Sequence, residues 1–232
     1  MNFERAKKKI SLRELWNNVD FSKPSTWGLI TANLSVIFYA FIDNLTATEV
    51  LWMYWIQSVI IGAFNFFRII RLKKFSTEGF KQNGKAVTPT QAAKVSTAIF
   101  FLFHYGFFHI VYGVFLATFP VILNEEKNTG ILYLLFPSIV FLINYGIEFY
   151  KEQTITTDEV PNLGTLMFMP YLRIIPMHLT IIFGGFMAAA GSFAGIKTSL
   201  AVILLLMGLK TFVDLITHSV NPLTGLKTPE TT

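Results

Sequence analysis

The sequence predicts an all-α fold: a polytopic membrane protein built as a six-transmembrane-helix bundle with cytoplasmic N- and C-termini. Three observations lead to this prediction. Of the 232 residues, 53% are hydrophobic and only 14% are charged, whereas soluble domains carry about 25% charged residues. Six apolar runs are long enough to cross a bilayer, which takes about 17 to 25 residues. Lys and Arg are concentrated in alternate connections between these runs.

The composition also excludes several classes of protein. The chain contains no Cys, which excludes a disulfide scaffold and a thiolate metal site. Its apolar content is incompatible with a disordered chain. The net charge is +5, but the basic residues flank apolar blocks instead of covering a folded surface, so no nucleic-acid partner is expected.

The six apolar runs give the elements of the bundle. They extend over residues 27–43, 48–70, 95–123, 131–150, 165–190 and 196–220. The connections on one side are short, so consecutive helices are expected to be antiparallel neighbours in a compact bundle. Thr46 and Glu49 predict a capped start for the second helix. Pro170 and Pro176 predict a break in the hydrogen-bond ladder of the fifth.

The basic residues orient this bundle through the positive-inside rule. Fifteen of the nineteen Lys and Arg residues lie on the side that holds both termini and the connections 72–94 and 151–164. The opposite side holds two, and the last two, Arg173 and Lys210, lie within predicted spans. The termini are therefore predicted to be cytoplasmic.

Three parts of the chain are expected: a basic leader over residues 1–26, the transmembrane domain over 27–220 and a polar tail over 221–232. In the leader, apolar residues share one stripe of a helix that also carries Lys and Arg. These are Leu12, Leu15, Trp16 and Val19. The stripe predicts a helix on the inner membrane surface that binds anionic lipid, and a loose basic leader is the alternative. The expected partner is the lipid bilayer, and association into a homo-oligomer is left open.

Polar side chains inside the spans are the best clue to function, because a charge at the centre of an inserted helix costs about 2.5 to 3.5 kcal/mol. Counting along the helices from the inner boundary puts several of them roughly 7 to 14 Å deep. These are Asn65, His104, Asn144, Arg173, Lys210 and Asp214. We therefore expect a polar layer in the cytoplasmic half of the bundle.

The last predicted helix carries Lys210, Asp214 and His218 at intervals of four, so they line one face. A Lys and an Asp one turn apart can pair and offset each other's desolvation cost. The pair has two interpretations. It locks the helix against its neighbours, or it belongs to a proton relay or ligand cradle in which His218 titrates.

All four His residues lie within predicted spans, and neutral imidazole suits Zn, Cu and Fe. His104 and His109 are about 140° apart around their helix, so they cannot bind one metal ion together. One possible metal site is formed by His104, His178, His218 and Asp214. In the alternative arrangement, two of these His residues are the axial ligands of a haem. The alternative is that these His residues form hydrogen bonds between helices.

Arg173, Lys210 and Asn144 are the candidate cofactor-binding or ligand-binding residues. Arg173 either extends back to the headgroups or holds, together with Lys210, an anionic group. Asn144 and Glu148 lie one turn apart on the fourth predicted helix, and Glu148 is expected to reach the inner interface near Lys151. The cofactor is unknown, and these residues are compatible with a metal ion or haem.

Several short motifs resemble an uncharacterised family of prokaryotic integral membrane proteins that is defined only as a domain of unknown function. The motifs are Tyr54-Trp55-Ile56-Gln57 with Phe64-Asn65-Phe66-Phe67-Arg68, Phe103-His104-Tyr105-Gly106, His178-Leu179-Thr180, and Lys210-Thr211-Phe212-Val213-Asp214 with His218. Gln57 stands where the family usually has an acidic residue. The resemblance implies a prokaryotic cytoplasmic membrane and implies no activity.

Three functions remain open, and whether the protein is an enzyme is not predicted. The polar residues form a pocket that binds a metal ion, haem or a small ligand. Alternatively, they are part of a proton-coupled transporter of a small solute. In the third interpretation they are structural contacts in a non-catalytic membrane subunit.

Overall fold

The computed structural model describes residues 16–125, 131–154, 160–190 and 198–219. The helices are α2 (Pro24–Ile42), α3 (Ala47–Arg71), α4 (Gln91–Leu123), α5 (Ile131–Thr154), α6 (Leu163–Phe168), the 3-10 helix η1 (Met169–Arg173), α7 (Ile174–Ala190) and α8 (Thr198–Ser219). Two short strands, β1 (Lys81–Gln82) and β2 (Lys85–Ala86), form an antiparallel hairpin. Each of the six predicted runs is helical, with ends that differ from the prediction by a few residues.

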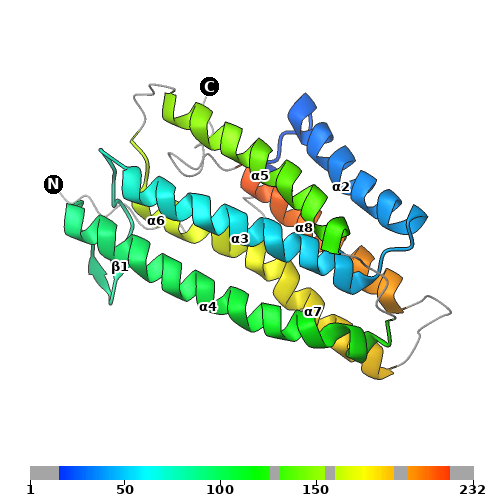
Figure 1. Cartoon of the computed structure of the whole chain (residues 1–232). Helices are drawn as coiled ribbons and strands as arrows, with labels where there is room; N and C mark the ends of the chain where they lie inside the picture. Colours follow the sequence, from blue (N-terminus) through cyan, green and yellow to red (C-terminus); the bar gives the residue numbers. More distant parts are fainter. Residues whose placement is uncertain (1–15, 126–130, 155–159, 191–197, 220–232) are drawn as a thin grey trace.

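Helix α3 is the centre of the bundle (Figure 1). It packs against α4, α5 and α8, and also against the α6–η1–α7 segment. Helix α2 packs mainly on α8, and α5 mainly on α3. Fully buried side chains fill the centre, among them Leu51, Phe101 and Leu206. Polar side chains that face this centre therefore lie among many apolar ones.

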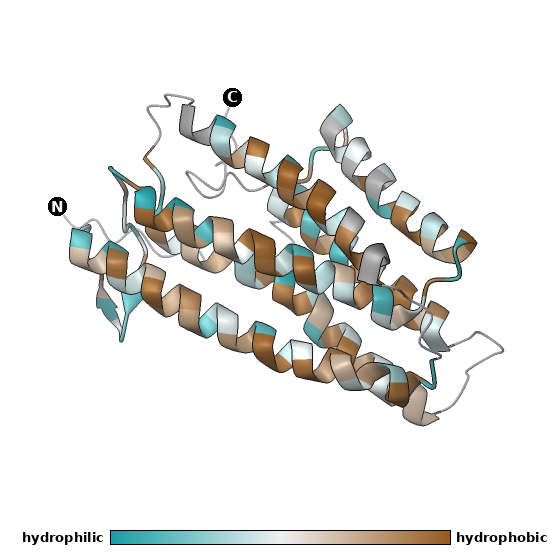
Figure 2. Cartoon of the chain, in the orientation of Figure 1, coloured by the Kyte–Doolittle hydropathy of each residue, from teal (hydrophilic) through white to brown (hydrophobic). Residues whose placement is uncertain are grey.

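Four helical segments are long and apolar enough to cross a membrane. They are Ala47–Arg71, Gln91–Leu123, Leu163–Ala190 and Thr198–Thr217. Hydrophobic residues predominate along the helices, and the hairpin is mainly hydrophilic (Figure 2). The structure thus supports a helical membrane protein. The count of six spans and the orientation of the termini stay predictions.

Two local predictions are confirmed. Thr46 and Glu49 form a capping box at the start of α3: the Thr46 hydroxyl accepts from the Glu49 amide, and the Glu49 carboxylate accepts from the Thr46 amide. The predicted break is the 3-10 helix η1 at Pro170, which separates α6 from α7. Proline has no N–H to donate and fixes its φ angle, so the α-helical ladder is interrupted there. At Pro176 the prediction is wrong, because this proline lies in the first turn of α7 and the helix continues through it.

The connection between α3 and α4 is a folded cap, which the charge pattern alone did not predict. The hairpin turns at Asn83–Gly84, where both residues have positive φ angles of 51° and 78°, as a two-residue type I′ turn requires. Ser76 pairs with Asn162 in a parallel bridge, and Phe80 is buried against α6. This loop is therefore fixed to the start of α6.

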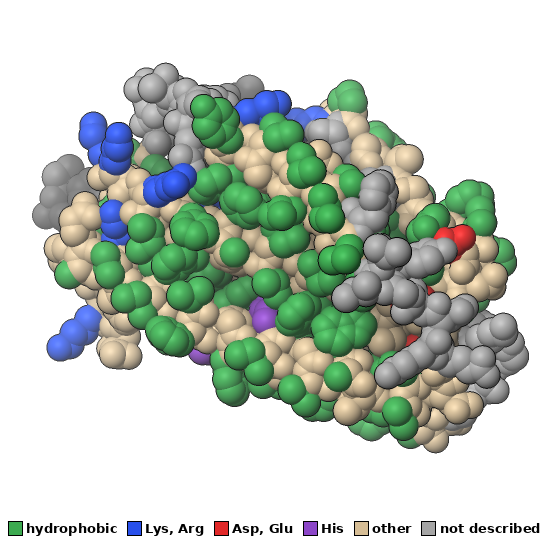
Figure 3. All heavy atoms as spheres, viewed as in Figure 1, with side chains coloured by type: hydrophobic (Ala, Val, Ile, Leu, Met, Phe, Trp, Pro, Cys, Tyr) green, Lys and Arg blue, Asp and Glu red, His purple; other side chains and the backbone are tan. Residues whose placement is uncertain are grey.

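The opposite end of the bundle is held by acidic and hydroxyl groups. The Glu125 carboxylate accepts from the backbone amides of Ala47 and Thr48 and from the Thr48 hydroxyl, which lies 2.6 Å away. An anion at a helix N-terminus satisfies unpaired amides and complements the helix dipole. Basic side chains gather at the hairpin end of the molecule instead (Figure 3).

The described part of the N-terminal leader begins at Trp16, whose ring stacks on Phe212 of α8 with centroids 5.4 Å apart. Trp16 therefore contacts the bundle although it is 39% exposed, and Val19 of the same predicted stripe is buried. Leu12 and Leu15 lie outside the described residues. Nearby, hydrogen bonds from Ser22 hold the pKa of the exposed Asp20 carboxyl below its ordinary value.

Candidate functional site

Three helical elements bring together a charged cluster, which consists of Asn33 on α2, Arg173 on η1, and Lys210 and Asp214 on α8. The Lys210 ammonium donates to the Asp214 carboxylate at 2.5 Å. It also donates to the Asn33 side-chain oxygen at 2.7 Å, and the Asn33 amide donates to the same carboxylate at 3.3 Å. The predicted pairing of Lys210 with Asp214 is confirmed.

Arg173 is the second cation on the same carboxylate. Its guanidinium lies 3.5 Å from Oδ1 of Asp214, the carboxylate oxygen that Lys210 and Asn33 do not contact. This distance is longer than the usual N–H···O distance of about 2.7 to 2.9 Å for a charged pair. The Arg173 side chain is 28% exposed, against 9% for Asp214. One carboxylate therefore serves two cations, and the more exposed cation is the more weakly held.

Tyr54 on α3 closes the inner side of the cluster. Its hydroxyl donates to the Arg173 carbonyl at 2.8 Å, which fixes the end of η1 against the central helix. The Lys210 ammonium lies 6.0 Å from the centre of the Tyr54 ring, at the outer limit for a cation–π contact. Tyr54 thus fixes η1 to α3 beside the cluster.

A second polar group, the neutral network, lies between α3 and α4 and consists of Ser58, Tyr105 and His109. His109 Nδ1 lies 2.9 Å from the Tyr105 carbonyl, and its Nε2 lies 2.9 Å from the Ser58 hydroxyl. Because a carbonyl only accepts, a neutral imidazole here carries its proton on Nδ1 and accepts from Ser58 at Nε2. The Tyr105 hydroxyl lies 2.8 Å from that of Ser58.

The other two described imidazoles bond to tyrosines on neighbouring helices. His104 Nδ1 lies 2.9 Å from the Tyr171 hydroxyl, and His178 Nδ1 lies 3.2 Å from the Tyr112 hydroxyl. These contacts match the interpretation of His as interhelical hydrogen-bonding groups. Asp214, in contrast, bonds to Lys210, Arg173 and Asn33.

The described residues contain no group of three or more His, Asp or Glu side chains that could hold a metal ion. The fourth predicted ligand, His218, lies in α8, and its side chain is outside the described residues. A site formed by His104, His178, His218 and Asp214 thus stays a prediction. The geometry that is described gives it no support.

The remaining predicted residues lie apart from the charged cluster or outside the description. Asn144 is exposed on α5, which packs mainly on α3. The Glu148 side chain is not among the described ones. Asn65 donates to the Leu166 carbonyl at 2.9 Å and so fixes α6 to α3. Of the three candidate ligand-binding residues, Arg173 and Lys210 both contact Asp214. Asn144 takes part in neither of these two ion pairs.

Two residues of these sites were missed by the sequence analysis, Asn33 and Ser58. Both are small neutral residues in apolar helices, and both are buried. Each has a buried polar residue of its own helix at a spacing of seven, Thr26 for Asn33 and Asn65 for Ser58. Their partners, however, lie 181 and 51 residues away along the chain, so this local spacing does not identify them.

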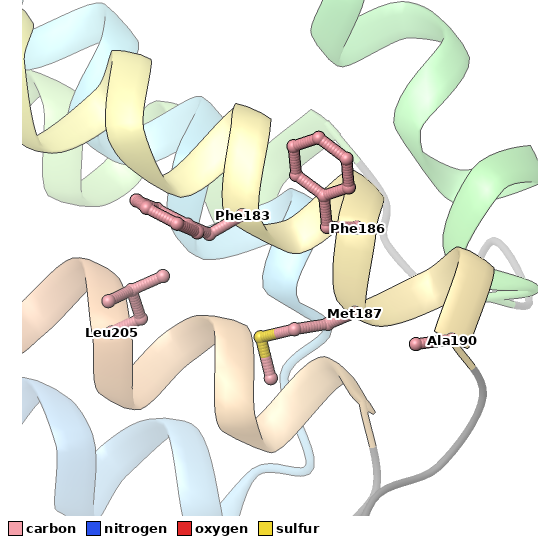
Figure 4. Close-up of a pocket in the computed structure, with 5 residues that line it drawn as sticks. All are labelled: Phe183, Phe186, Met187, Ala190 and Leu205. Carbon is pink, nitrogen blue, oxygen red and sulfur yellow. The ribbon is translucent and has the colours of Figure 1, made fainter.

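Two cavities lie away from the charged cluster. One of about 400 Å³ lies between α7 and α8 and is lined by Phe183, Phe186, Met187, Ala190 and Leu205 (Figure 4). Its walls are entirely hydrophobic side chains, as expected for a surface that faces hydrocarbon. The other, of about 560 Å³, lies between the hairpin and the α6–η1 segment.

Comparison with curated proteins and with solved structures gives no match. One family model matches residues 15–231, which is nearly the whole chain and includes both polar groups described above. This match agrees with the resemblance seen in the motifs. The chain belongs to a family of unknown function (DUF6498).

Proposed function

We propose that the protein is a multi-pass membrane protein in which α2 and α5 also cross the bilayer, giving six spans, with both termini in the cytoplasm of a prokaryotic cell. The apolar length of α2 and α5 and the basic residues at the hairpin end support this topology. The motif resemblance supports the prokaryotic location.

Because the chain has no Cys, single Cys substitutions test this topology directly. A membrane-impermeant maleimide is expected to label Asp43→Cys in intact cells. It should label Lys23→Cys, Lys85→Cys and Lys151→Cys only after the membrane is permeabilised. Labelling of Lys151→Cys in intact cells would contradict a crossing by α5, and a fully reversed pattern would contradict the orientation.

We further propose that the charged cluster binds a small carboxylate or phosphate anion. The observation that carries this proposal is that Lys210 and Arg173 share the single carboxylate of Asp214. Among the described residues, the cluster therefore carries one positive charge in excess, in surroundings of low dielectric constant where an uncompensated charge is costly. A bound anion on the exposed side of Arg173 would balance it.

Arginine suits this role because its planar guanidinium binds carboxylate and phosphate oxygens through two parallel hydrogen bonds. Lys210 has two partners at 2.5 and 2.7 Å and stays as the fixed cation. Arg173, whose guanidinium has one long contact within the described part of the chain, is the group that can turn toward a ligand.

Thermal unfolding of the purified protein in detergent tests this site. Phosphate or acetate, titrated at constant ionic strength, is expected to raise the melting temperature to a saturating value. A ligand at a hundred times its Kd stabilises the folded state by about 2.7 kcal/mol. The shift should vanish in Arg173→Gln and persist in the control Lys73→Gln, an exposed Lys outside the cluster. An equal shift in Arg173→Gln would reject the site.

A further inference from the structure

The cavity at the hairpin end is a groove with two chemically different walls. The cap contributes Glu78, Phe80 and Lys81, and the α6–η1 segment contributes Phe168, Met169 and Leu172. The groove has a volume of about 560 Å³. The two charged groups of the lining thus come from the cap, and most of its apolar side chains come from the α6–η1 segment.

The groove is held in shape by contacts that do not use its lining charges. Leu163 donates its backbone amide to the Ser76 carbonyl, and the Ser76 amide donates to the Pro161 carbonyl, both at 2.8 Å. Asn162 caps α6 and donates its side-chain amide to the Glu78 carbonyl at 3.0 Å. The two walls are therefore joined along the backbone, and the groove exists without a ligand.

Phe80 sets the floor of the groove. It is buried and meets Phe168 edge to face with ring centroids 6.3 Å apart. A Cβ at Gly164 would lie 3.1 Å from the Phe80 side chain, so the glycine allows the cap to pack closely on α6. Phe168 itself is 56% exposed, which leaves a large apolar ring on the groove wall.

The position of the groove relative to the spans indicates what surrounds it. Candidate spans end at Arg71 and begin at Gln91 and Leu163, and the groove lies where these three ends meet. At this depth a bilayer presents headgroups next to the first acyl carbons. The apolar wall leads from the cap into the hydrocarbon, and the charged wall faces the headgroup layer.

The charges on the lining are one carboxylate, Glu78, and one ammonium, Lys81, and both side chains are exposed. Neither makes an ion pair within the described part of the chain. The complement of such a pair is a zwitterion with a phosphate and an ammonium group, attached to an apolar chain.

We infer that this groove binds one phosphatidylethanolamine-type phospholipid, with its phosphate on Lys81, its primary ammonium on Glu78 and one acyl chain along Phe168, Met169 and Leu172. The inference requires the membrane location and is independent of the anion site at Arg173. Two further basic residues in the connection between α3 and α4, Lys73 and Lys74, add a positive field that favours the phosphate.

Native mass spectrometry of the full-length protein in detergent tests this site. Phosphatidylethanolamine is titrated against phosphatidylcholine of the same chains, which has the same charges but no N–H donor. We expect one phosphatidylethanolamine bound at least tenfold more tightly than phosphatidylcholine. Glu78→Gln should remove this preference, and Lys81→Gln should weaken both lipids about tenfold. Lys85→Gln, on the same hairpin but outside the groove, should change neither.

Both substituted side chains are exposed, and an unchanged melting temperature in each variant will show that the cap stays folded. Equal binding of the two lipids by the unsubstituted protein would overturn the inference. So would an equal loss of binding in Lys85→Gln and Lys81→Gln, which would show only a general attraction to the basic surface. Tighter binding of phosphatidylglycerol than of phosphatidylethanolamine would overturn it as well. Loss of anion binding in Arg173→Gln would leave this result unaffected, so the two proposals can fail separately.

Discussion

The charged cluster and the neutral network solve the same problem in different ways. Both place polar groups inside an apolar helical bundle, where an unpaired group is costly. In the neutral network each donor of Ser58, Tyr105 and His109 has an acceptor within 3.0 Å. In the charged cluster one carboxylate is shared by two cations. The donors of the neutral network are therefore all paired. The charged cluster, among the described residues, has one positive charge that no carboxylate balances.

This difference indicates which group is structural and which is a candidate for ligand binding. A complete network gains nothing from a ligand, because every new contact would displace an existing one. A cluster with excess charge gains from an anion. Substitutions in the two groups should therefore differ in stability and in their response to anions.

The largest effect is expected for Asp214→Asn. This change leaves Lys210 and Arg173 without a carboxylate, so the free energy of unfolding should fall by about 3 to 5 kcal/mol. Chemical denaturation in detergent measures it. Added phosphate should restore part of the loss, since the cluster then has two excess charges. A loss below 1 kcal/mol, as for an exposed pair, would mean that the cluster is well solvated. It would then contradict the view that the cluster holds an unbalanced charge inside the bundle.

The next largest effect is expected for Gly62→Ala beside the neutral network. A Cβ at Gly62 would overlap the Tyr105 ring, so Tyr105 must move away from Ser58. Overpacking of this kind costs about 1 to 3 kcal/mol. The matched control is Gly106→Ala on α4, where nothing lies within 4 Å of the added carbon and the change should stay within about 0.5 kcal/mol. Equal effects of the two substitutions would exclude the close packing of α3 on Tyr105.

A smaller effect is expected for Ser58→Ala, which removes one hydroxyl from the network and leaves His109 Nε2 without its donor. Interhelical hydrogen bonds in membranes contribute about 0.6 kcal/mol on average, so the free energy of unfolding should fall by about 1 kcal/mol once the orphaned acceptor is included. Thr180→Val is the control, because the buried Thr180 hydroxyl has no partner in the described structure. That substitution should be neutral or stabilising.

The sequence predicted the parts of this structure that depend on local pattern. The capped start at Thr46 and Glu49, the break at Pro170 and the pair of Lys210 with Asp214 all rest on residues within one or two helical turns. The hairpin was missed although Asn83–Gly84 is a strong turn signal, because the basic residues around it were interpreted only as a topology signal. Asn33 and Ser58 could not be predicted, since the contacts that make them important join distant segments.

The smallest effect on stability is expected for Arg173→Gln, and it separates the two interpretations of the charged cluster. The variant keeps the short contact between Lys210 and Asp214 and loses a 3.5 Å contact from a partly exposed side chain, so the free energy of unfolding should change by less than about 1 kcal/mol. Without added anion, its melting curve should nearly superimpose on that of the unsubstituted protein.

With phosphate added, the two curves should separate, because only the unsubstituted cluster has an excess charge to balance. If Arg173 served only to lock η1 onto α8, the variant would instead be destabilised to the same extent with and without phosphate. The measurement thus distinguishes a group that is complete in the folded protein from one that is completed by its ligand, which is the difference between the neutral network and the charged cluster.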